Sequence, residues 1–196
     1  MRLHRFYVLQ PLGEEVVIED VSVIKQWTKV FRYKKSDLVI LFNGEGTDVT
    51  YSIDSQSPKI TTLVRTSISP SYVPEIKVTL YLSLIKKDNF ELVVQKATEL
   101  GVSTIVPILS DRSEKKNINE ERLQKIAIES SEQCGRGDIP TILPIMTLKE
   151  VLDIPLPHNV SYFLDIDGVP LRDKNKKINT IGLFIGSEGV WSDVGK

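Results

Sequence analysis

The chain has 196 residues, of which 41% are hydrophobic and 26% charged, a mixture typical of one large or two small globular domains. A formal net charge of −1 argues against a protein that coats RNA through an overall positive charge, although it leaves local basic patches open. One cysteine and two histidines cannot form an internal disulfide or a zinc cluster, and no apolar run is long enough to cross a membrane. We therefore expect a cytoplasmic protein without a metal or a membrane span.

Short apolar stretches alternate with turn signals over the first part of the chain. Residues 43–46 read Asn-Gly-Glu-Gly, which is typical of a hairpin turn between two apolar runs. The predicted strands cover residues 6–9, 15–18, 38–42 and 49–53. We therefore predict a small β-barrel over residues 1–72, followed by a proline-containing linker over residues 69–74.

Strands and helices alternate from residue 73 onward, which predicts a mostly parallel α/β sheet. The predicted strands cover residues 77–83, 104–109, 161–165 and 181–185. The last two are nearly continuous apolar runs and predict strands covered on both faces. Pro107 predicts that the second strand lies at a sheet edge or is irregular.

Two amphipathic helices are predicted between these strands. Asp88 is expected to cap the first helix, and Gly101 to end it. Asn119 is expected to cap the second helix. Cys134 falls on the inner face of that helix, so we expect a buried thiol that serves as a small apolar filler.

The loop after residues 181–185 begins Gly186-Ser187-Glu188-Gly189. Ligands in open α/β sheets bind outside the carboxyl ends of strands, and glycines there let a backbone approach a ligand closely. The loop therefore predicts a binding site, although such a turn is commonly just a connection. The sequence contains no G-x-G-x-x-G, P-loop or G-x-S-x-G motif.

Basic residues occur in clusters despite the balanced charge. Such clusters could form local RNA-binding patches, and a solvated surface is the other interpretation. The clusters comprise Arg2, His4 and Arg5; Lys25, Lys29, Arg32, Lys34 and Lys35; Arg112, Lys115 and Lys116; and Lys174, Lys176 and Lys177.

Several ordered motifs together resemble the RsmE family of 16S ribosomal RNA uridine-N3 methyltransferases, in the SPOUT superfamily. They are Arg2-Leu3-His4-Arg5-Phe6-Tyr7-Val8, the stretch 86–102 (KKDNFELVVQKATELGV), Asp111-Arg112-Ser113, Glu132-Gln133-Cys134-Gly135-Arg136 and the stretch 185–192 (IGSEGVWS). The resemblance covers nearly the whole chain, and its colinear order makes it more specific than any single motif.

The resemblance implies a PUA-like β-barrel over residues 1–72 that helps to hold RNA. It also implies an α/β domain of the trefoil-knot type over residues 73–196 that binds S-adenosylmethionine. Members of the family act as homodimers on 16S ribosomal RNA or the small ribosomal subunit. We therefore expect N3 methylation of a uridine in that RNA.

The resemblance also suggests site residues. Expected cofactor-binding residues are Leu164, Asp165, Ile185, Gly186, Ser187, Glu188 and Gly189. Expected RNA contacts are Arg2, His4, Arg5, Lys29 and Arg32. Arg5, Arg112 and Arg136 are candidates for stabilising the developing uridine anion or for contacting phosphate, and a structural role competes for each.

Two departures from the family pattern favour an alternative function. Ser187 and Val190 stand where the family has proline and glycine, and a valine is strained if that position requires positive φ. The sequence also ends at Lys196, before the family's last segment, so we expect a C-terminally truncated domain with an incomplete knot. The alternative is a non-catalytic RNA-binding protein derived from this family.

Overall fold

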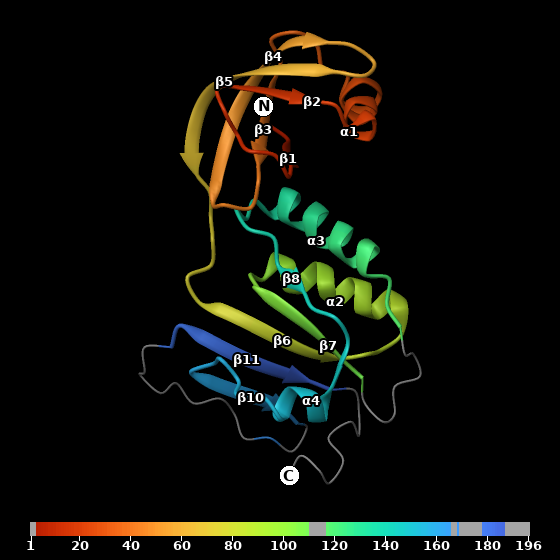
Figure 1. Ribbon diagram of the computed structural model, residues 1–196, viewed down its shortest axis with the longest axis vertical. Coiled ribbons are helices and arrows are strands. Elements are labelled where there is room, and N and C mark those ends of the chain that lie inside the picture. The colour runs from red at the N-terminus through yellow and green to blue at the C-terminus, as the bar shows by residue number, and fades with distance from the viewer. Residues whose placement is uncertain (1–2, 110–116, 166–167, 169–177, 187–196) are drawn as a thin grey trace. The chain divides into compact units, whose positions relative to one another are not determined.

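A computed structural model describes residues 3–109, 117–165, 168 and 178–186. The chain divides into two compact units. The first unit comprises Met1–Val73 together with Ser131–Asp138, and the second comprises Pro74–Ser130 with Ile139–Lys196 (Figure 1). A short segment from the later half of the sequence therefore packs with the amino-terminal unit.

The first unit is built on a five-stranded mixed sheet with the order β1-β3-β4-β5-β2. Its strands are β1 (Arg5–Tyr7), β2 (Glu15–Ile18), β3 (Leu38–Phe42), β4 (Thr47–Gln56) and β5 (Thr61–Pro70). Strands β1 and β3 pair in parallel, and the other neighbours pair antiparallel. The predicted hairpin is confirmed as β3–β4, joined by a turn in which Gly44 and Gly46 have positive φ.

Strand β5 and a helical segment were not predicted. Strand β5 extends to Pro70 and so includes the first two residues of the predicted linker. The sequence did not indicate this strand, because its outer half is polar and lacks a clear alternation of buried residues. The helical segment comprises α1 (Val21–Lys25) and the π-helix η1 (Gln26–Phe31). The Asp20 side chain accepts hydrogen bonds from the backbone N–H groups of Ser22 and Val23, and so caps α1.

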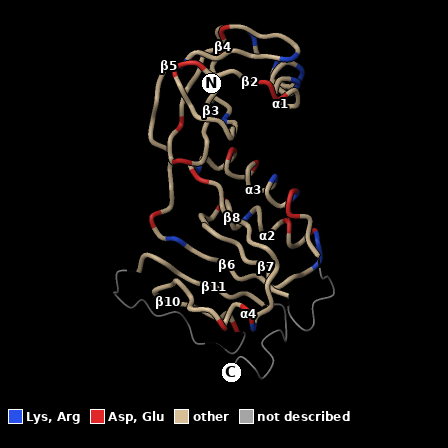
Figure 2. Tube along the Cα trace, viewed as in Figure 1, with Lys and Arg blue, Asp and Glu red and all other residues tan. Residues whose placement is uncertain are grey.

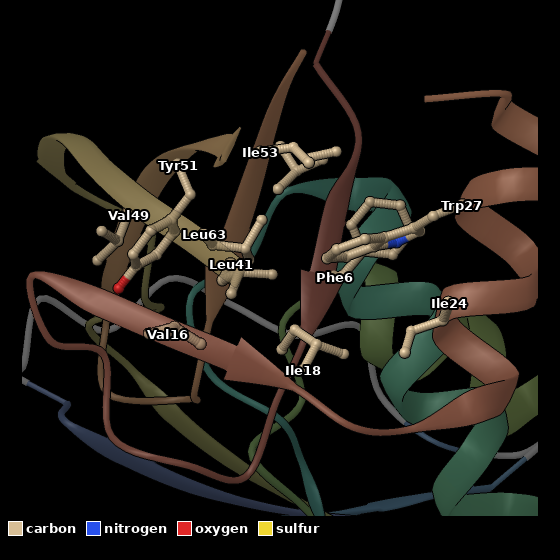
Figure 3. Close-up of a cluster of buried hydrophobic side chains, with 11 residues drawn as sticks. Phe6, Val16, Ile18, Ile24, Trp27, Leu41, Val49, Tyr51, Ile53 and Leu63 are labelled. Carbon is tan, nitrogen blue, oxygen red and sulfur yellow. The ribbon is translucent and has the colours of Figure 1, made fainter. Parts of the chain in front are cut away.

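The core of the first unit lies between this sheet and the helical segment (Figure 3). Alternate residues of β4, namely Val49, Tyr51 and Ile53, point inward, as the two-residue period of a strand requires. Trp27 on the helical segment is fully buried, and its ring centroid lies 5.1 Å from that of Phe6. Burial of these large rings supplies much of the apolar stabilisation of the unit.

The second unit contains a parallel sheet with the order β10-β11-β6-β7-β8, and β9 also pairs with β7. Its strands are β6 (Lys77–Ser83), β7 (Thr104–Leu109), β8 (Thr141–Ile142), β9 (Met146–Thr147), β10 (Val160–Leu164) and β11 (Thr180–Ile185). Its helices are α2 (Lys87–Glu99), α3 (Glu120–Cys134) and α4 (Leu148–Leu152); the last residues of α3 belong to the first unit. The predicted parallel α/β sheet is confirmed.

Helices cover both faces of this sheet (Figure 1). Leu80 and Leu82 of β6 pack in one cluster with residues of α2 and α3. Tyr81 of β6 points to the opposite face, where it packs with Phe184 of β11 and Val151 of α4. The central strands β6 and β11 therefore bury both of their faces, as the apolar run over residues 181–185 predicted.

The helix boundaries confirm two predicted signals and correct two others. The Asn119 side chain accepts a hydrogen bond from the backbone N–H of Arg122 (3.0 Å), and Gly101 has a φ of +91° just after α2. Asp88 is not a cap, because α2 begins one residue earlier and Asp88 lies in its first turn. Cys134 is exposed rather than buried, because it lies at the last position of α3, beyond the buried stripe of that helix.

Pro107 lies inside the sheet, so the edge position is wrong and the other predicted alternative, an irregularity in the pairing, is the one observed. Strand β7 pairs with β6 on one side, while β8 and β9 pair with it on the other. The carbonyl of Ile105 accepts from Leu143 on the β8–β9 side, and backbone groups alternate along a strand, so Pro107 faces that side as well. The short strands β8 and β9 pair with residues before and after Pro107, so its missing N–H falls in the gap between them.

Strand β10 also differs from its predicted environment. It lies at the end of the sheet order, and its residues Phe163 and Leu164 are exposed. The apolar run over residues 161–165 predicted a strand covered on both faces, but such a run does not distinguish an edge strand from a central one.

Candidate functional site

The carboxyl ends of three neighbouring strands form the first part of the candidate site. Leu164, the last residue of β10, pairs with Ile185, the last residue of β11, and Ile185 in turn pairs with Leu82 of β6. Because these strands are parallel, the loops that follow them leave from one edge of the sheet. Four expected cofactor-binding residues, Leu164, Asp165, Ile185 and Gly186, are thus brought together. The other three, Ser187, Glu188 and Gly189, lie outside the described residues.

Ser83 contributes a buried polar atom at the same edge. It directly follows Leu82, the partner of Ile185, and its hydroxyl has no hydrogen-bond partner among the described residues. A buried hydroxyl without a partner is costly, so the position of this one at the strand ends calls for an explanation. A polar ligand at this edge would therefore find a hydroxyl available.

A stack of aromatic rings holds these strands in register on the face that carries α4. Tyr81, Phe184 and Phe163 occupy paired positions on β6, β11 and β10. Successive ring centroids are 4.1 Å apart, with interplanar angles of 5° and 9°. Three rings that stack across three strands restrict sliding of one strand past the next, so they fix the relative positions of the loops at the strand ends.

His158 closes one end of this stack. Its Nε2 lies 2.9 Å from the Tyr81 hydroxyl oxygen. A Cβ at Gly182 would lie 2.6 Å from the His158 ring, so the absence of a side chain on β11 lets the imidazole approach. Burial lowers the pKa of His158 and raises the pKa of Tyr81. The pair is therefore a neutral hydrogen bond near pH 7, which suits a structural role.

Arg5 lies at the centre of a network within the first unit. Its Nε and Nη2 donate to both carboxylate oxygens of Asp48 at 2.8 and 2.6 Å. Its Nη1 donates to the carbonyl oxygen of Ser131 at 2.9 Å, and its Nη2 also lies 3.2 Å from the carbonyl oxygen of Arg136. The guanidinium carbon lies 4.1 Å from the ring centroid of Phe42. We call these residues the Arg5 clamp, because they hold segment Ser131–Asp138 against the amino-terminal sheet.

The environments of two candidate arginines favour the structural alternative. Only 9% of the Arg5 side chain is exposed, and its donors are directed to protein acceptors. The side chain of Arg136 is 2% exposed, and its Nε donates to Asp138 at 2.9 Å. Contact of either guanidinium with RNA or with a uridine would require these interactions to open. Arg112 lies outside the described residues.

Three of the expected RNA contacts surround the helical segment of the first unit. Lys29 and Arg32 are exposed, and Arg32 ends the π-helix in the left-handed conformation, with a φ of +57°. The exposed His4 ring lies 4.3 Å from the Phe31 ring, and its Nδ1 lies 2.7 Å from the Tyr33 hydroxyl oxygen. Figure 2 shows the basic residues of this segment in blue. Of the remaining expected contacts, Arg5 belongs to the clamp, and Arg2 lies outside the described residues.

π-Helices and left-handed non-glycine residues are uncommon and concentrate at functional sites. Here both occur in the segment that carries the basic residues, next to aromatic rings. Cations beside partly exposed rings can bind the phosphates and bases of an unpaired RNA strand. We call His4, Lys29, Phe31, Arg32 and Tyr33 the basic-aromatic surface.

Sequence reasoning missed the residues that depend on distant partners. Asp48 lies 43 positions from its partner Arg5 in the sequence. Glu132 accepts a hydrogen bond from the backbone N–H of Tyr7, which lies 125 positions away. Ser83 and His158 also carried no motif. The one available signal was the co-occurrence of Arg5 and Glu132 in two motifs of the same family.

The described residues contain neither a metal-binding cluster nor a membrane-spanning helix. None of their His, Cys, Asp and Glu side chains form a group of three or more that could hold a metal ion. No helix of the described residues is long and apolar enough to cross a membrane.

Comparison with known proteins places the chain in a family. A family model described as an RNA methyltransferase domain matches residues 73–194. Ribosomal RNA small subunit methyltransferase E of Rickettsia conorii is 29% identical over 155 residues, which cover 78% of this chain and 63% of that protein. The enzyme of the same name from Helicobacter pylori is 30% identical over 197 residues, which cover 95% of this chain and 84% of that protein.

Solved structures agree with this assignment. The crystal structure of a ribosomal RNA small subunit methyltransferase E from Neisseria gonorrhoeae, bound to S-adenosylmethionine, superposes with a TM-score of 0.87 at 26% identity. The match covers 99% of this chain and 83% of that one. The chain therefore belongs to the ribosomal RNA small subunit methyltransferase E family of RNA methyltransferases.

Proposed function

We propose that this protein transfers a methyl group from S-adenosylmethionine to N3 of a uridine in 16S ribosomal RNA. The observation that carries the proposal is the pairing of Leu164 with Ile185, which brings the two expected cofactor loops to one edge of a parallel sheet. Family membership supports the reaction class, and the Neisseria relative was solved with this cofactor. A ribosomal substrate is consistent with the expected cytoplasmic location.

The proposed cofactor site uses Leu164, Asp165, Ile185 and Gly186 together with the continuing loop of residues 187–189. When bound, the cofactor would supply an electrophilic methyl group on a sulfonium, whose S–CH3 bond breaks as the methyl group leaves a neutral thioether behind. Backbone groups at strand ends and the unpartnered Ser83 hydroxyl suit the polar parts of such a ligand. The apolar side chains of Leu164 and Ile185 suit its adenine ring.

The acceptor requires activation. Uridine N3 carries a proton, so a new N–C bond forms productively only as that proton leaves to water or a base. A nearby cation stabilises the negative charge that develops on the ring, and close positioning of the two reactants lowers the barrier further. We assign the cation to Arg112, because Arg5 and Arg136 are engaged within the first unit.

The first unit is proposed to act as a PUA-like barrel that holds the RNA. Its basic-aromatic surface supplies Lys29 and Arg32 for phosphates, and His4 with its neighbouring rings for unpaired bases. We further propose that the protein acts as a homodimer with a trefoil-knot catalytic domain, as the family resemblance implies.

Calorimetric titration of the purified chain with S-adenosylmethionine tests the cofactor assignment. Gly186→Leu should abolish binding, because a bulky side chain then enters the proposed loop. Gly13→Leu, which changes an exposed glycine of the first unit, should bind as wild type. Equal binding by both variants would contradict the assignment.

The reaction itself is tested with small-subunit RNA that lacks the modification. Mass spectrometry of its nucleosides should show 3-methyluridine after incubation with protein and cofactor. RNA binding without cofactor binding would instead favour the non-catalytic RNA-binding protein. A different methylated nucleoside would retain the enzyme class and overturn the N3 assignment.

A further inference from the structure

A cavity in the second unit lies apart from the expected cofactor-binding residues. Its volume is about 260 Å³, and it opens where the chain passes from β6 into α2. Buried Leu84, Phe90 and Leu123 form an apolar floor, while exposed Lys87, Asn117 and Asn119 contribute its polar lining. We call this cavity the β6–α2 pocket. None of the described cofactor-binding residues lines it.

The size of the pocket limits its ligand. Sites for drug-sized molecules typically span roughly 300–1,000 Å³, so a volume slightly below that range suits one small ring system. A whole S-adenosylmethionine molecule is too large to be enclosed there. A single nucleobase with part of its ribose matches the available space.

Two charged residues, Lys87 and Glu91, line the pocket among the described residues. Lys87 is therefore the cation that a phosphate on the ligand would contact. The Glu91 charge is compensated, because Arg122 Nε donates to it at 2.6 Å and Lys87 Nζ lies 3.7 Å away. That contact with Arg122 lowers the pKa of Glu91, so the carboxylate stays ionised and paired.

The start of α2 offers a second group that attracts an anion. The helix has 13 residues, and Lys86 at its N-cap position makes no side-chain capping hydrogen bond within the described part of the chain. The first N–H groups of a helix and its dipole attract anions. An apolar floor beside Lys87 and the first N–H groups of α2 therefore fits a flat apolar ring attached to a phosphate.

Asn117 supplies the remaining element of recognition. A side-chain amide offers both a donor and an acceptor, as the edge of a nucleobase requires. The oxygen of Asn119 already accepts from the backbone N–H of Arg122, so its role is to cap α3. Asn117 therefore offers the amide for a ligand.

We propose that the β6–α2 pocket binds one unstacked nucleotide of the substrate RNA, next to the uridine that accepts the methyl group. This proposal rests on the proposed function for the identity of the RNA. Strand β6 neighbours β11 in the parallel sheet, so the pocket and the expected cofactor loop open at the same sheet edge. Proteins that recognise RNA commonly extrude bases from single-stranded regions into such pockets.

Binding of fluorescein-labelled single-stranded oligoribonucleotides by the full chain tests the proposal. Lys87→Ala and Asn117→Ala should each weaken binding about tenfold, within the range found for single base contacts. Lys87→Ala should also reduce the dependence of log K on log salt by about 0.7, the loss of one phosphate contact with a single strand. Both residues are exposed, so the fold should be retained.

Lys125→Ala is the matched control. Lys125 lies 3.9 Å from Glu129 in an i,i+4 pair on α3, as Lys87 lies 3.7 Å from Glu91 on α2, but it does not line the pocket. The control should bind RNA as wild type. Wild-type RNA binding by both pocket variants, or equal weakening by Lys125→Ala, would overturn the proposal.

Binding experiments with uridine and adenosine monophosphates test whether the pocket binds RNA or free nucleotides. Mononucleotide binding that depends on Lys87 and Asn117, without any such dependence for the oligonucleotides, would overturn the assignment to RNA. Titration with S-adenosylmethionine is a separate readout. Both pocket variants should bind S-adenosylmethionine normally. If the wild type does not bind S-adenosylmethionine, the proposed function is contradicted, whereas the assignment of the pocket is not.

Discussion

Replacement of Arg5 by methionine separates a structural role for this residue from a role in RNA binding. The substitution removes the guanidinium and keeps a long apolar side chain. Asp48, which is 16% exposed, would then remain partly buried without its bidentate partner. The carbonyl oxygens of Ser131 and Arg136 would also lose a donor.

The expected loss in free energy of unfolding follows from this geometry. Removal of one partner from a buried ion pair costs roughly 3–5 kcal/mol, because an uncompensated charge stays inside. With a urea m-value of roughly 1–3 kcal/mol/M, the midpoint should fall by at least about 1 M. Lys35→Met is the matched control, because its ion pair with Asp54 has side chains that are 72% and 53% exposed. Such a pair contributes about 0–1 kcal/mol, so the control midpoint should barely move.

Urea unfolding followed by tryptophan fluorescence measures these shifts. A Trp191→Phe background leaves Trp27, which is buried in the core of the first unit, as the reporter. Removal of both charges in Arg5→Met/Asp48→Leu should recover much of the loss. If Arg5→Met unfolds at the same urea concentration as Lys35→Met and yet loses RNA binding, the clamp interpretation is refuted and Arg5 is a functional residue.

Three further substitutions test other parts of the structure. Ser83→Ala should raise the free energy of unfolding by up to about 1–3 kcal/mol, which corresponds to roughly 2–4 °C in melting temperature per kcal/mol, and should weaken S-adenosylmethionine binding. A fall in both stability and cofactor binding would show that the hydroxyl has a structural partner. Burial lowers the pKa of His158, so on acidification the unfolded state takes up a proton before the folded state does. The free energy of unfolding should therefore decline as the pH falls from the ordinary value of 6.5 to the lower pKa of the folded state. The difference in urea stability between wild type and His158→Gln should follow this pH dependence, and a constant difference would argue against it. Gly137→Ala should lower the melting temperature more than Gly135→Ala, because a Cβ at Gly137 would lie 2.7 Å from Ser71 Cβ. A Cβ at Gly135 meets no described atom within 4 Å and carries only the strain of positive φ. Equal losses would show that the backbone at Gly137 can shift.

Local patterns predicted the second unit well because its elements are defined by local physics. The strands at Lys77–Ser83 and Thr104–Leu109 occur where apolar runs indicated them. The period of apolar residues also located both long helices. Asn119 and Gly101 marked helix ends because a side-chain oxygen and a residue without a Cβ satisfy specific backbone requirements there.

Features that depend on distant contacts could not be predicted in this way. Nothing within residues 131–138 indicates that this segment packs with strands more than a hundred residues earlier. Pro107 is tolerated inside the sheet because two short strands leave a gap beside it, and neither strand has a recognisable pattern. The exposure of Cys134 likewise depends on which turn of α3 is covered, rather than on its helical face.

The candidate site shows the same division. The pairing of Leu164 with Ile185 follows from parallel strands and was foreseeable once both were recognised. The environments of the candidate arginines were not foreseeable, because a motif match identifies a residue without its interaction partners. Arg5 and Arg136 illustrate this point, since both match the family pattern and both donate to carboxylates within the first unit.

The roles of these arginines bear on the proposed chemistry. A cation stabilises a developing uridine anion only if its charge is not already compensated by a carboxylate, because a paired guanidinium contributes little further field. The bidentate pairing of Arg5 with Asp48 and the pairing of Arg136 with Asp138 therefore make both poor sources of that stabilisation. If the clamp is confirmed, Arg112 is the remaining candidate arginine, and Arg112→Lys should lower kcat for methylation while S-adenosylmethionine binding and the urea midpoint stay unchanged. A loss of folding in that variant would instead assign Arg112 a structural role as well.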